Sequence, residues 1–492
     1  MFLSQPELIV SDQTLQTQKR LFGNTALLLG GEGIAQLANL VFVVALARVF
    51  GRELLGAYAF SMSVGALLGV LVTLGTLALV LRQLSREPKR TSEVTGALLI
   101  FQLCVALVLI LATYAAARLL NAGSLATVVA TLVVAYHVLT QVTRLFLVGY
   151  MAREKMAAAA ALPVVRRILT LLLAGAAMGA GLGAEVALAA MPIAALMILV
   201  LSGFLAMRHF GRPAFRLHWP EVLEYLRQAR PFFYVVVLET LFRRIGIIYL
   251  AVLGSREAVG LFASAERLVS AAGITQSMFF AALFPLVSRL WQSDLAQFAE
   301  IVNRAGRLIL LLTLPLATVI ALFARDIIDI VYGEAFREAS ALLSGIAWML
   351  AIHGIAKLLA TISQAADQQR TLVTSKAWGL AALTLCSVVL VPRYEAAGLV
   401  AAFLVGELAS AVCNYTLLRR RNVPLMSFQS ALNVSGACLV AACVTYLGSD
   451  LALWLRVLAV GSAGVAALWI FRALRGHDLA YLASIAASRN VR

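Results

Sequence analysis

RELLGAYA, residues 52–59, and REAVGLFA, residues 256–263, are two copies of one motif. LSR at 84–86 and VSR at 287–289 repeat at almost the same offset, 203 residues against 204. Repetition at one offset indicates that the chain has two related halves. Six predicted helices separate the copies, and an even number gives both halves the same orientation in a membrane. We therefore predict two six-helix lobes related by a pseudo-twofold axis along the membrane normal.

The composition around these motifs is that of a membrane protein. Of the 492 residues, 62% are hydrophobic and only 13% are charged, whereas soluble domains are about 25% charged. Many apolar stretches reach the roughly 20 residues that a helix needs to cross the hydrocarbon layer. The chain is therefore predicted to be an all-α integral membrane protein without a soluble domain of useful size.

Apolar runs between charged or turn-forming interruptions predict about 14 transmembrane helices. The first twelve form the two lobes, 21–206 and 232–418, and two C-terminal helices follow within 427–471. A cytoplasmic segment, 1–20, precedes them, and a cytoplasmic tail, 472–492, ends the chain. The predicted spans are 21–47, 54–81, 94–118, 125–149, 162–181, 185–206, 232–253, 259–285, 306–324, 340–366, 371–391, 396–418, 427–448 and 451–471.

The cytoplasmic linker between the lobes, 207–231, is predicted to contain an amphipathic helix. In its portion WPEVLEYLRQAR, helical spacing places four residues on one face, namely Val222, Tyr225, Leu226 and Ala229. A partly apolar face on a charged helix is typical of segments that lie on a membrane surface. We expect this helix to lie on the membrane surface.

The basic residues are distributed by side of the membrane. The formal net charge of +16 would suggest nucleic acid as a partner of a soluble protein. Here 27 of the 40 Lys and Arg fall on the N-terminal side, in every second connection and in the tail, and only eight fall in the alternate connections. Because cytoplasmic loops carry the excess of positive charge, both termini are predicted to be cytoplasmic. No nucleic acid is expected as a partner.

The five cysteines all lie in apolar segments, and none forms a CxxC pair. We interpret them as small core residues rather than as a disulfide framework or a metal site. No metal and no cofactor are expected. The cysteines are Cys104, Cys386, Cys413, Cys438 and Cys443.

The count of basic residues by side of the membrane places Arg166, Arg167 and Lys376, near the ends of their spans, with the connections. It leaves five cations for the interior of the spans, and they are Arg144, Arg243, Arg244, Arg267 and Lys357. An ionisable side chain at the bilayer centre costs about 2.5 to 3.5 kcal/mol on insertion scales, so each needs a partner or a water-filled cavity. Arg243 is the twelfth residue of the span 232–253, too deep to reach the interface easily. Glu239, four positions earlier on the same face, is expected to neutralise one of the two adjacent arginines in part.

Polar stripes at helical spacing accompany these cations. In lipid such stripes must face protein or water, and they predict a cavity between the lobes that is positive on its second-lobe wall. Interhelical hydrogen bonds are the alternative explanation, and Arg144 could instead reach the interface. The stripes are Glu32, Gln36 and Asn39, then His137, Gln141 and Arg144, then His353, Lys357 and Gln364, with Glu266 and Glu407 on two further helices.

The first lobe opens with ALARVFGRELLGAYAFSMSVGALLGVLVTLG, residues 45–75, followed by LRQLSRE at 81–87. This opening resembles the polysaccharide transporter family of the MOP (multidrug, oligosaccharidyl-lipid, polysaccharide) superfamily. That family includes Wzx-type O-antigen flippases and is related to the lipid II flippase MurJ and to MATE exporters. VPRYEAAGLVAAF at 391–403 is similar to the family's turn before its twelfth helix. The resemblance covers the whole chain.

The resemblance implies a substrate and a mechanism. The substrate is an oligosaccharide on a polyprenyl pyrophosphate, moved from the cytoplasmic to the outer leaflet of the cell inner membrane by alternating access. The product feeds O-antigen, capsule or exopolysaccharide synthesis. The implied partners are this lipid-linked oligosaccharide, membrane lipid, and a polysaccharide polymerase with other biosynthesis proteins. The protein is not expected to be an enzyme.

The candidate site residues follow from chemistry and position. Arginine offers a planar fork of donors that matches phosphate oxygens. The predicted pyrophosphate ligands are Arg243, Arg244, Arg267, Lys357 and Arg144. The predicted sugar contacts are Gln36, Asn39, Gln141 and His353. The candidates for coupling to an ion are Glu32, Glu239 and Glu407.

Three other functions remain open at this point. A MATE-like exporter of small organic cations would need a cavity dominated by carboxylates and aromatic faces. A membrane glycosyltransferase, polymerase or ligase would need acids close to an outward interface. One acidic cluster meets that description, and we interpret it as solvated loop charges: Asp326, Asp329, Glu334 and Glu338, among Arg325 and Arg337. A scaffold in a biosynthetic complex would leave the buried arginines unexplained.

Overall fold

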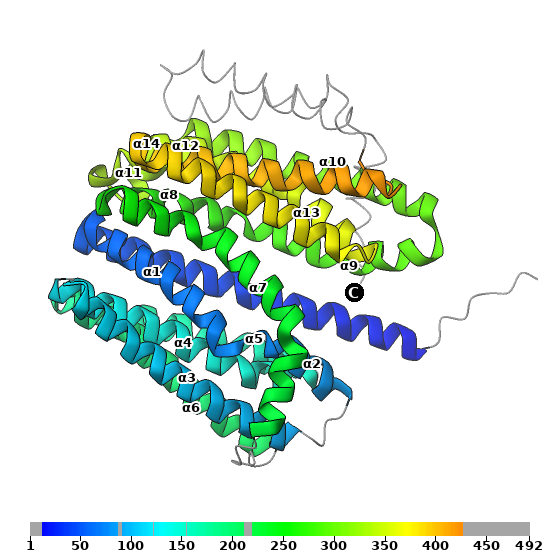
Figure 1. Cartoon of the computed structure of the whole chain (residues 1–492), viewed down its shortest axis with the longest axis horizontal. Helices are drawn as coiled ribbons and strands as arrows, with labels where there is room; N and C mark the ends of the chain where they lie inside the picture. The colour runs from blue at the N-terminus through cyan, green and yellow to red at the C-terminus, as the bar shows by residue number, and fades with distance from the viewer. Residues whose placement is uncertain (1–11, 87–90, 122, 154, 211–218, 427–492) are drawn as a thin grey trace, which may run out of the picture. The chain divides into compact units, whose positions relative to one another are not determined.

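The computed structural model describes residues 12–86, 91–121, 123–153, 155–210 and 219–426. Throughout these ranges the regular elements are helices and no strand occurs (Figure 1). The predicted spans 427–448 and 451–471, the tail, and Cys438 and Cys443 lie outside the described residues.

The first part of the chain forms six helices. A break at Leu74 and Gly75, which both have positive φ, separates the first two helices. Their bounds are α1 Asp12–Thr73, α2 Thr76–Arg86, α3 Thr91–Leu119, α4 Ser124–Ala152, α5 Met156–Gly179 and α6 Ala184–Phe210.

The second part forms eight α-helices and one 3-10 turn. Their bounds are α7 Trp219–Leu253, α8 Arg256–Ala272, α9 Ile274–Ser293, α10 Leu295–Leu322, α11 Ala324–Val331, η2 Glu334–Phe336, α12 Ala339–Ala347, α13 Met349–Ala365 and α14 Gln369–Arg420. The predicted spans 259–285 and 340–366 are each divided, into α8 with α9 and into α12 with α13.

The apolar helices agree with the predicted class. Nine stretches of the described chain are long and apolar enough to cross a membrane. Two of them, Gly30–Thr73 and Gln369–Arg420, each overlap two predicted spans. The helix α7 covers the predicted span 232–253 but is not one of the nine. All twelve predicted spans before residue 419 therefore fall on helices, while the total of fourteen stays a prediction.

Kinks mark the boundaries between the merged spans. Gly51 has φ 79° and ψ −177° inside α1, a backbone conformation that glycine adopts without strain. Glu395 has φ 45° and ψ −123° inside α14, within the turn predicted from VPRYEAAG. The sequence therefore predicts where each long helix changes direction.

The linker before the second lobe differs from its prediction. α7 begins at Trp219 and continues through Pro231 without a break, so the predicted surface helix and the following span are one helix. Val222 and Ala229 on its predicted apolar face are fully buried, and Tyr225 packs against a hydrophobic core of the protein. The face that we expected on the membrane surface contacts protein instead.

The described chain divides into two compact units. Unit 1 contains Leu68–Tyr234 and the described residues before Val43, and unit 2 contains Val43–Leu67 and the described residues after Tyr234. The predicted lobes, 21–206 and 232–418, therefore do not coincide with the units, because 43–67 packs with the second half. Both α1 and α7 pass from one unit to the other.

Each unit has its own apolar core. In unit 1, α4 contacts α2, α3, α5 and α6, and Val138, Val142 and Leu145 of α4 are buried there. In unit 2, α13 contacts α9, α10 and α14, and Ile309 and Ile362 are buried in the core. Large apolar side chains such as Leu107 on α3 are exposed, as expected of helices that face lipid.

Candidate functional site

The two adjacent arginines of α7 carry their charges at the surface of unit 2. Arg243 is exposed and Arg244 is half-buried. Neighbouring positions on a helix differ by about 100°, so the two guanidinium groups point in different directions. Neither forms a hydrogen bond or an ion pair with any residue that the structure describes. The expected pairing with Glu239 is therefore not formed.

Further charges lie around this pair. The charged groups close enough to interact electrostatically with the Arg244 guanidinium are Glu266 and Arg267 of α8, together with Arg243. Both α8 side chains are half-buried. Three guanidinium groups and one carboxylate thus lie near one another in unit 2, and the balance is positive.

Lys357 of α13 joins this set. Its Nζ lies 3.4 Å from the Ser277 Oγ and 5.7 Å from the centroid of the Phe280 ring. The charged groups that act on it are Arg243 and Glu239. Glu239 of α7 is therefore a neighbour of Lys357 of α13. Spacing along one helix could not predict this contact between two helices. The structure brings together four of the five predicted phosphate ligands, and we name Arg243, Arg244, Arg267 and Lys357 the cationic set.

A buried carboxylate lies beside the cationic set. Glu407 of α14 is 3% exposed, and its Oε1 lies 2.9 Å from Nδ1 of His353. Nζ of Lys376 lies 3.8 Å from the other oxygen, Oε2, and 4.6 Å from the centroid of the Phe242 ring. Arg243 also acts on Glu407. This arrangement unites a predicted sugar contact, a predicted ion-coupling residue and a lysine that the sequence analysis assigned to a connection.

The remaining predicted residues lie in unit 1. Gln36 donates a hydrogen bond to Glu32 over 2.9 Å, and Arg144 donates one to Gln141 over 3.3 Å. Glu32 is also the acidic neighbour of Arg144. The polar stripes of α1 and α4 are therefore close together. Arg144, the fifth predicted phosphate ligand, lies in a different unit from the other four.

Two arginines of α5 were missed by the sequence analysis. Nη1 of Arg167 donates to Oδ1 of Asn39 over 2.6 Å, and Arg166, which is 7% exposed, donates to the Tyr136 hydroxyl and lies over its ring. These contacts join α5 to α1 and α4. The alternative explanation, hydrogen bonds between helices, therefore applies to Asn39, which is buried. Arg166, Arg167 and Lys376 all fall inside predicted spans, and this position could have identified them as candidate site residues.

The two motif copies quoted at the outset meet in unit 2. A Cβ atom on Gly56 would lie 2.1 Å from the carbonyl oxygen of Arg256, and a Cβ atom on Gly260 would lie 2.1 Å from that of Arg52. Only glycine allows backbones to approach this closely. The copies thus pack α1 against α8 through equivalent positions.

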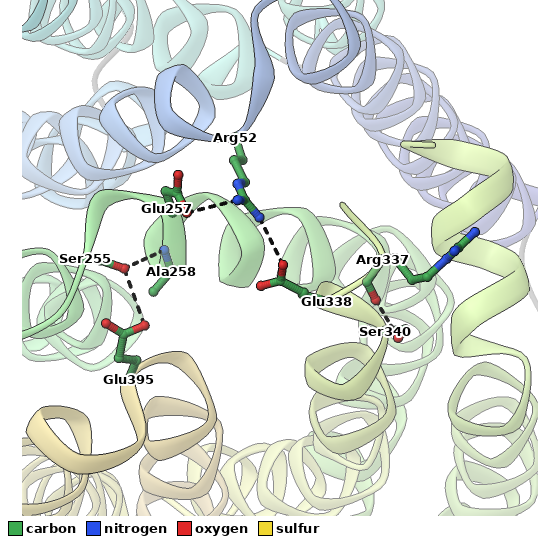
Figure 2. A network of polar contacts seen from close by, with 8 residues as sticks. All are labelled: Arg52, Ser255, Glu257, Ala258, Arg337, Glu338, Ser340 and Glu395. Carbon is green, nitrogen blue, oxygen red and sulfur yellow. Dashed lines mark hydrogen bonds and ion pairs between the residues drawn. The ribbon is translucent and has the colours of Figure 1, made fainter. Parts of the chain in front are cut away.

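An ionic network surrounds this crossing (Figure 2). Arg52 lies between two carboxylates, at 3.1 Å from Glu257 and 3.2 Å from Glu338. Arg48 donates to the carbonyl oxygens of Val331, over 2.7 Å, and Ile330 at the end of α11. The middle of α1 is therefore bound to the end of α11 and to Glu338, which lies directly before α12.

Arginines pair with the acidic cluster near residue 330. Arg337 lies 3.2 Å from Asp329 and 2.9 Å from Glu334. The hydrogen bonds that the Arg337 guanidinium donates to Asp329, then to Glu334, raise its pKa. Three of the four acids interpreted as solvated loop charges, Asp329, Glu334 and Glu338, are therefore ion-paired, because arginines from α1 and from the same loop reach them.

Metal-ligating side chains do not cluster in the part of the chain that the structure describes. No group of three or more His, Cys, Asp or Glu side chains that could hold a metal ion occurs among the described residues.

Known proteins resemble this chain in sequence and in fold. A family profile described as "Polysaccharide biosynthesis protein" matches residues 21–291. No curated protein sequence matches the chain significantly. Among solved structures, the lipid II flippase MurJ in an inward closed conformation aligns with a TM-score of 0.74 at 14% identity, over 91% of this chain and 98% of that chain.

Two further solved structures are less similar. The Vibrio cholerae MATE transporter VcmN in the bent form has a TM-score of 0.55 at 20% identity, over 85% of this chain and 100% of that chain. A MOP superfamily transporter from Pyrococcus furiosus has a TM-score of 0.59 at 16% identity, over 82% and 95%. These likenesses show the fold, and they confirm the predicted all-α membrane class.

Proposed function

Because the chain belongs to the polysaccharide biosynthesis protein family, whose profile matches more than half of it, we propose that it is a flippase for a polyprenyl-pyrophosphate-linked oligosaccharide. The predicted membership of the MOP superfamily is confirmed by the family match and by the MurJ and MATE folds. The protein is a multi-pass membrane protein. The proposed movement is from the cytoplasmic to the outer leaflet, in synthesis of a cell-surface polysaccharide, without covalent chemistry.

The cationic set carries this proposal. Arg243 is exposed and makes no hydrogen bond to a described residue, so its five donors are available to a ligand. A pyrophosphate carries at least two negative charges, and guanidinium groups match its oxygens in pairs. Two arginines, side by side in a predicted span, exceed what helix packing requires, whereas an anionic headgroup would use both.

The sugar would contact the polar groups next to these cations. The side chain of His353 is 46% exposed, and its Nδ1 is held by Glu407, so Nε2 remains for a hydroxyl group. In unit 1, the predicted sugar contacts Gln36 and Gln141 are both partly exposed, so their amides are accessible. Asn39 is engaged by Arg167, so we assign it a smaller role in sugar binding than the two glutamines.

The membrane potential favours export of this substrate. With the cell interior negative, each negative charge moved outward gains about 2.3 kcal/mol per 100 mV, and two charges gain roughly 4.6 kcal/mol. Alternating access of the cationic set to the two sides would use this gain without a coupled ion. Glu32, Glu239 and Glu407 are the carboxylates that a coupled ion would use.

The cellular setting follows from the same proposal. If the lipid-linked oligosaccharide is made in the cytoplasm, the protein lies in the inner membrane. Both of its termini are then cytoplasmic, and a polysaccharide polymerase acts on the exported product. The charge bias of the connections supports this orientation.

A MATE-like exporter of small cations is the second candidate, because MATE transporters share the fold. The charges distinguish the two functions. Around Arg243, the cationic set and Lys376 supply five cations against the three carboxylates Glu239, Glu266 and Glu407. An organic cation would be repelled by this balance, whereas a pyrophosphate would be attracted.

Reconstitution tests the proposal. Purified protein in liposomes, given a defined polyprenyl-pyrophosphate oligosaccharide, should move it between leaflets. The double variant Arg243→Ala with Arg244→Ala should lose most of this transport. Arg118→Ala, an exposed arginine at the end of α3, is the matched control and should retain it. Export of an organic cation that survives the double substitution, with no lipid movement in the wild type, would favour the MATE-like function.

A further inference from the structure

The carboxylate of Glu407 is covered by the imidazole of His353 and the ammonium group of Lys376. The side chain of Glu407 is 4% exposed, whereas those of His353 and Lys376 are 46% and 22% exposed. The carboxylate is therefore covered, while both groups that contact it can still be reached by a ligand.

The contact between Glu407 and Lys376 is loose. The distance of 3.8 Å from Nζ to Oε2 is an ion pair but exceeds a hydrogen bond. Oε2 is buried and accepts no hydrogen bond from the residues that the structure describes. The ammonium group of Lys376 therefore has no hydrogen bond to this oxygen that a ligand would first have to break.

Lys376 lies next to the cationic set. Its ammonium group lies over the ring of Phe242, the residue that precedes Arg243 on α7. Arg243 in turn acts on Glu407. A ligand held by Arg243 would therefore be close to Lys376, whose flexible stem carries three donors.

The surroundings of Oε2 argue against a metal cation as the missing partner. Lys376 on α14, Arg243 on α7 and His353 on α13 face Glu407, and Lys357 follows one turn beyond His353. Sodium or another cation would be repelled by this ring. An anion that competes with the carboxylate would be attracted by it.

We propose that Lys376 is a further ligand for the phosphate groups of the substrate, and that Glu407 holds this lysine until the substrate displaces the carboxylate. The inference rests on the proposed function. A pyrophosphate offers more charge and more acceptor oxygens than one carboxylate, so the ammonium group gains by the exchange. When the headgroup leaves, Glu407 recovers Lys376, which weakens rebinding and speeds release.

Binding measurements on the purified full-length protein test this exchange. The probes are farnesyl pyrophosphate and inorganic pyrophosphate, which share the phosphate groups and differ in the lipid tail. Glu407→Gln should tighten binding of both by about 5-fold, a typical coupling between neighbouring groups. Lys376→Gln should weaken it. A gain confined to farnesyl pyrophosphate would place the effect on the tail and overturn the assignment.

A double substitution isolates the pair. Glu407→Gln should tighten binding when Lys357→Gln is also present, but not when Lys376→Gln is present. If the gain persists without Lys376, or if Glu407→Gln weakens binding, the inference is wrong. Glu407→Asp, which keeps the charge and withdraws it by one methylene, should give a smaller gain, and it serves where the Gln variant fails to fold.

Transport separates this inference from the proposed function. Glu407→Gln should lower KM and also lower the maximal export rate in liposomes, because release becomes slow. A wild-type protein that neither binds nor moves the lipid-linked probe would overturn both the proposed function and the inference. A wild type that binds and exports, with an unchanged Glu407→Gln variant, would overturn the inference alone.

Discussion

Gly56 and Gly260 face each other where α1 crosses α8. A Cβ atom on Gly56 would lie 3.1 Å from the backbone nitrogen of Gly260, and a Cβ atom on Gly260 would lie 3.2 Å from that of Gly56. The contacts are reciprocal, as in an interface between two like subunits. The two copies of one motif therefore form a single crossing, of the small-residue kind that is common between membrane helices.

Substitution of either glycine should destabilise unit 2. Gly56→Ala or Gly260→Ala places a methyl group 2.1 Å from a carbonyl oxygen, which only a shift of the helices can relieve. Overpacking of this kind costs about 1 to 3 kcal/mol. Thermal unfolding in detergent should show a lower Tm. Gly175→Ala on α5 meets nothing within 4 Å and is the matched control. Equal Tm values for all three variants would refute the close crossing.

The ion pairs of Arg52 should contribute little at physiological salt. Its partners Glu257 and Glu338 are 46% and 73% exposed, and such pairs contribute about 0.2 to 1 kcal/mol. A double-mutant cycle with Arg52→Gln and Glu338→Gln should give a coupling in that range, which decreases in 1 M salt. A coupling that does not change with salt would mean that the network is more buried than the structure places it.

Tyr332 gives stability a dependence on alkaline pH. Burial raises the pKa of its phenol above the ordinary tyrosine range. Because the unfolded phenol ionises near pH 10, stability is constant below that pH and falls as the pH rises above it. The hydroxyl accepts or donates no hydrogen bond within the described chain. Tyr332→Phe should therefore be neutral or up to about 1 kcal/mol more stable at pH 8, with a weaker decline towards pH 11.

The check on Tyr332 is a series of unfolding curves between pH 8 and pH 11. Tyr394→Phe, at an exposed tyrosine, is the control and should leave the curve unchanged. A large loss of stability in Tyr332→Phe at pH 8 would show that the hydroxyl has a partner.

The sequence was informative about helices and less so about their neighbours. Apolar runs placed twelve predicted spans on helices, and VPRYEAAG located the kink at Glu395, because these features depend on local chemistry. The repeat predicted two halves. It could not reveal that its copies contact each other, because a helical period identifies a face and not the helix that covers it.

For the candidate site too, the sequence predicted which residues matter better than it predicted their partners. Four cations of the second lobe share one unit, as their positions suggested. Glu239 was expected beside Arg243 from its spacing, yet it acts on Lys357, more than one hundred residues away. Lys376 and Arg166 were counted with the connections, although both lie inside predicted spans. Spacing along one helix does not identify neighbours on other helices, such as Phe242 beside Lys376 and Tyr136 beside Arg166.

The chemistry of Arg243 and Arg244, rather than their charge alone, should determine transport. Lysine at both positions keeps the charge but loses the planar fork that binds phosphate oxygens in pairs. Bonds between charged groups are the strong ones, so the double Lys variant should export a lipid-linked oligosaccharide at least about 10-fold more slowly, and the double Ala variant more slowly still. Arg118→Lys should have no effect. If lysine fully replaces both arginines, the headgroup is held by charge alone, and bidentate recognition of pyrophosphate is not what these two residues provide.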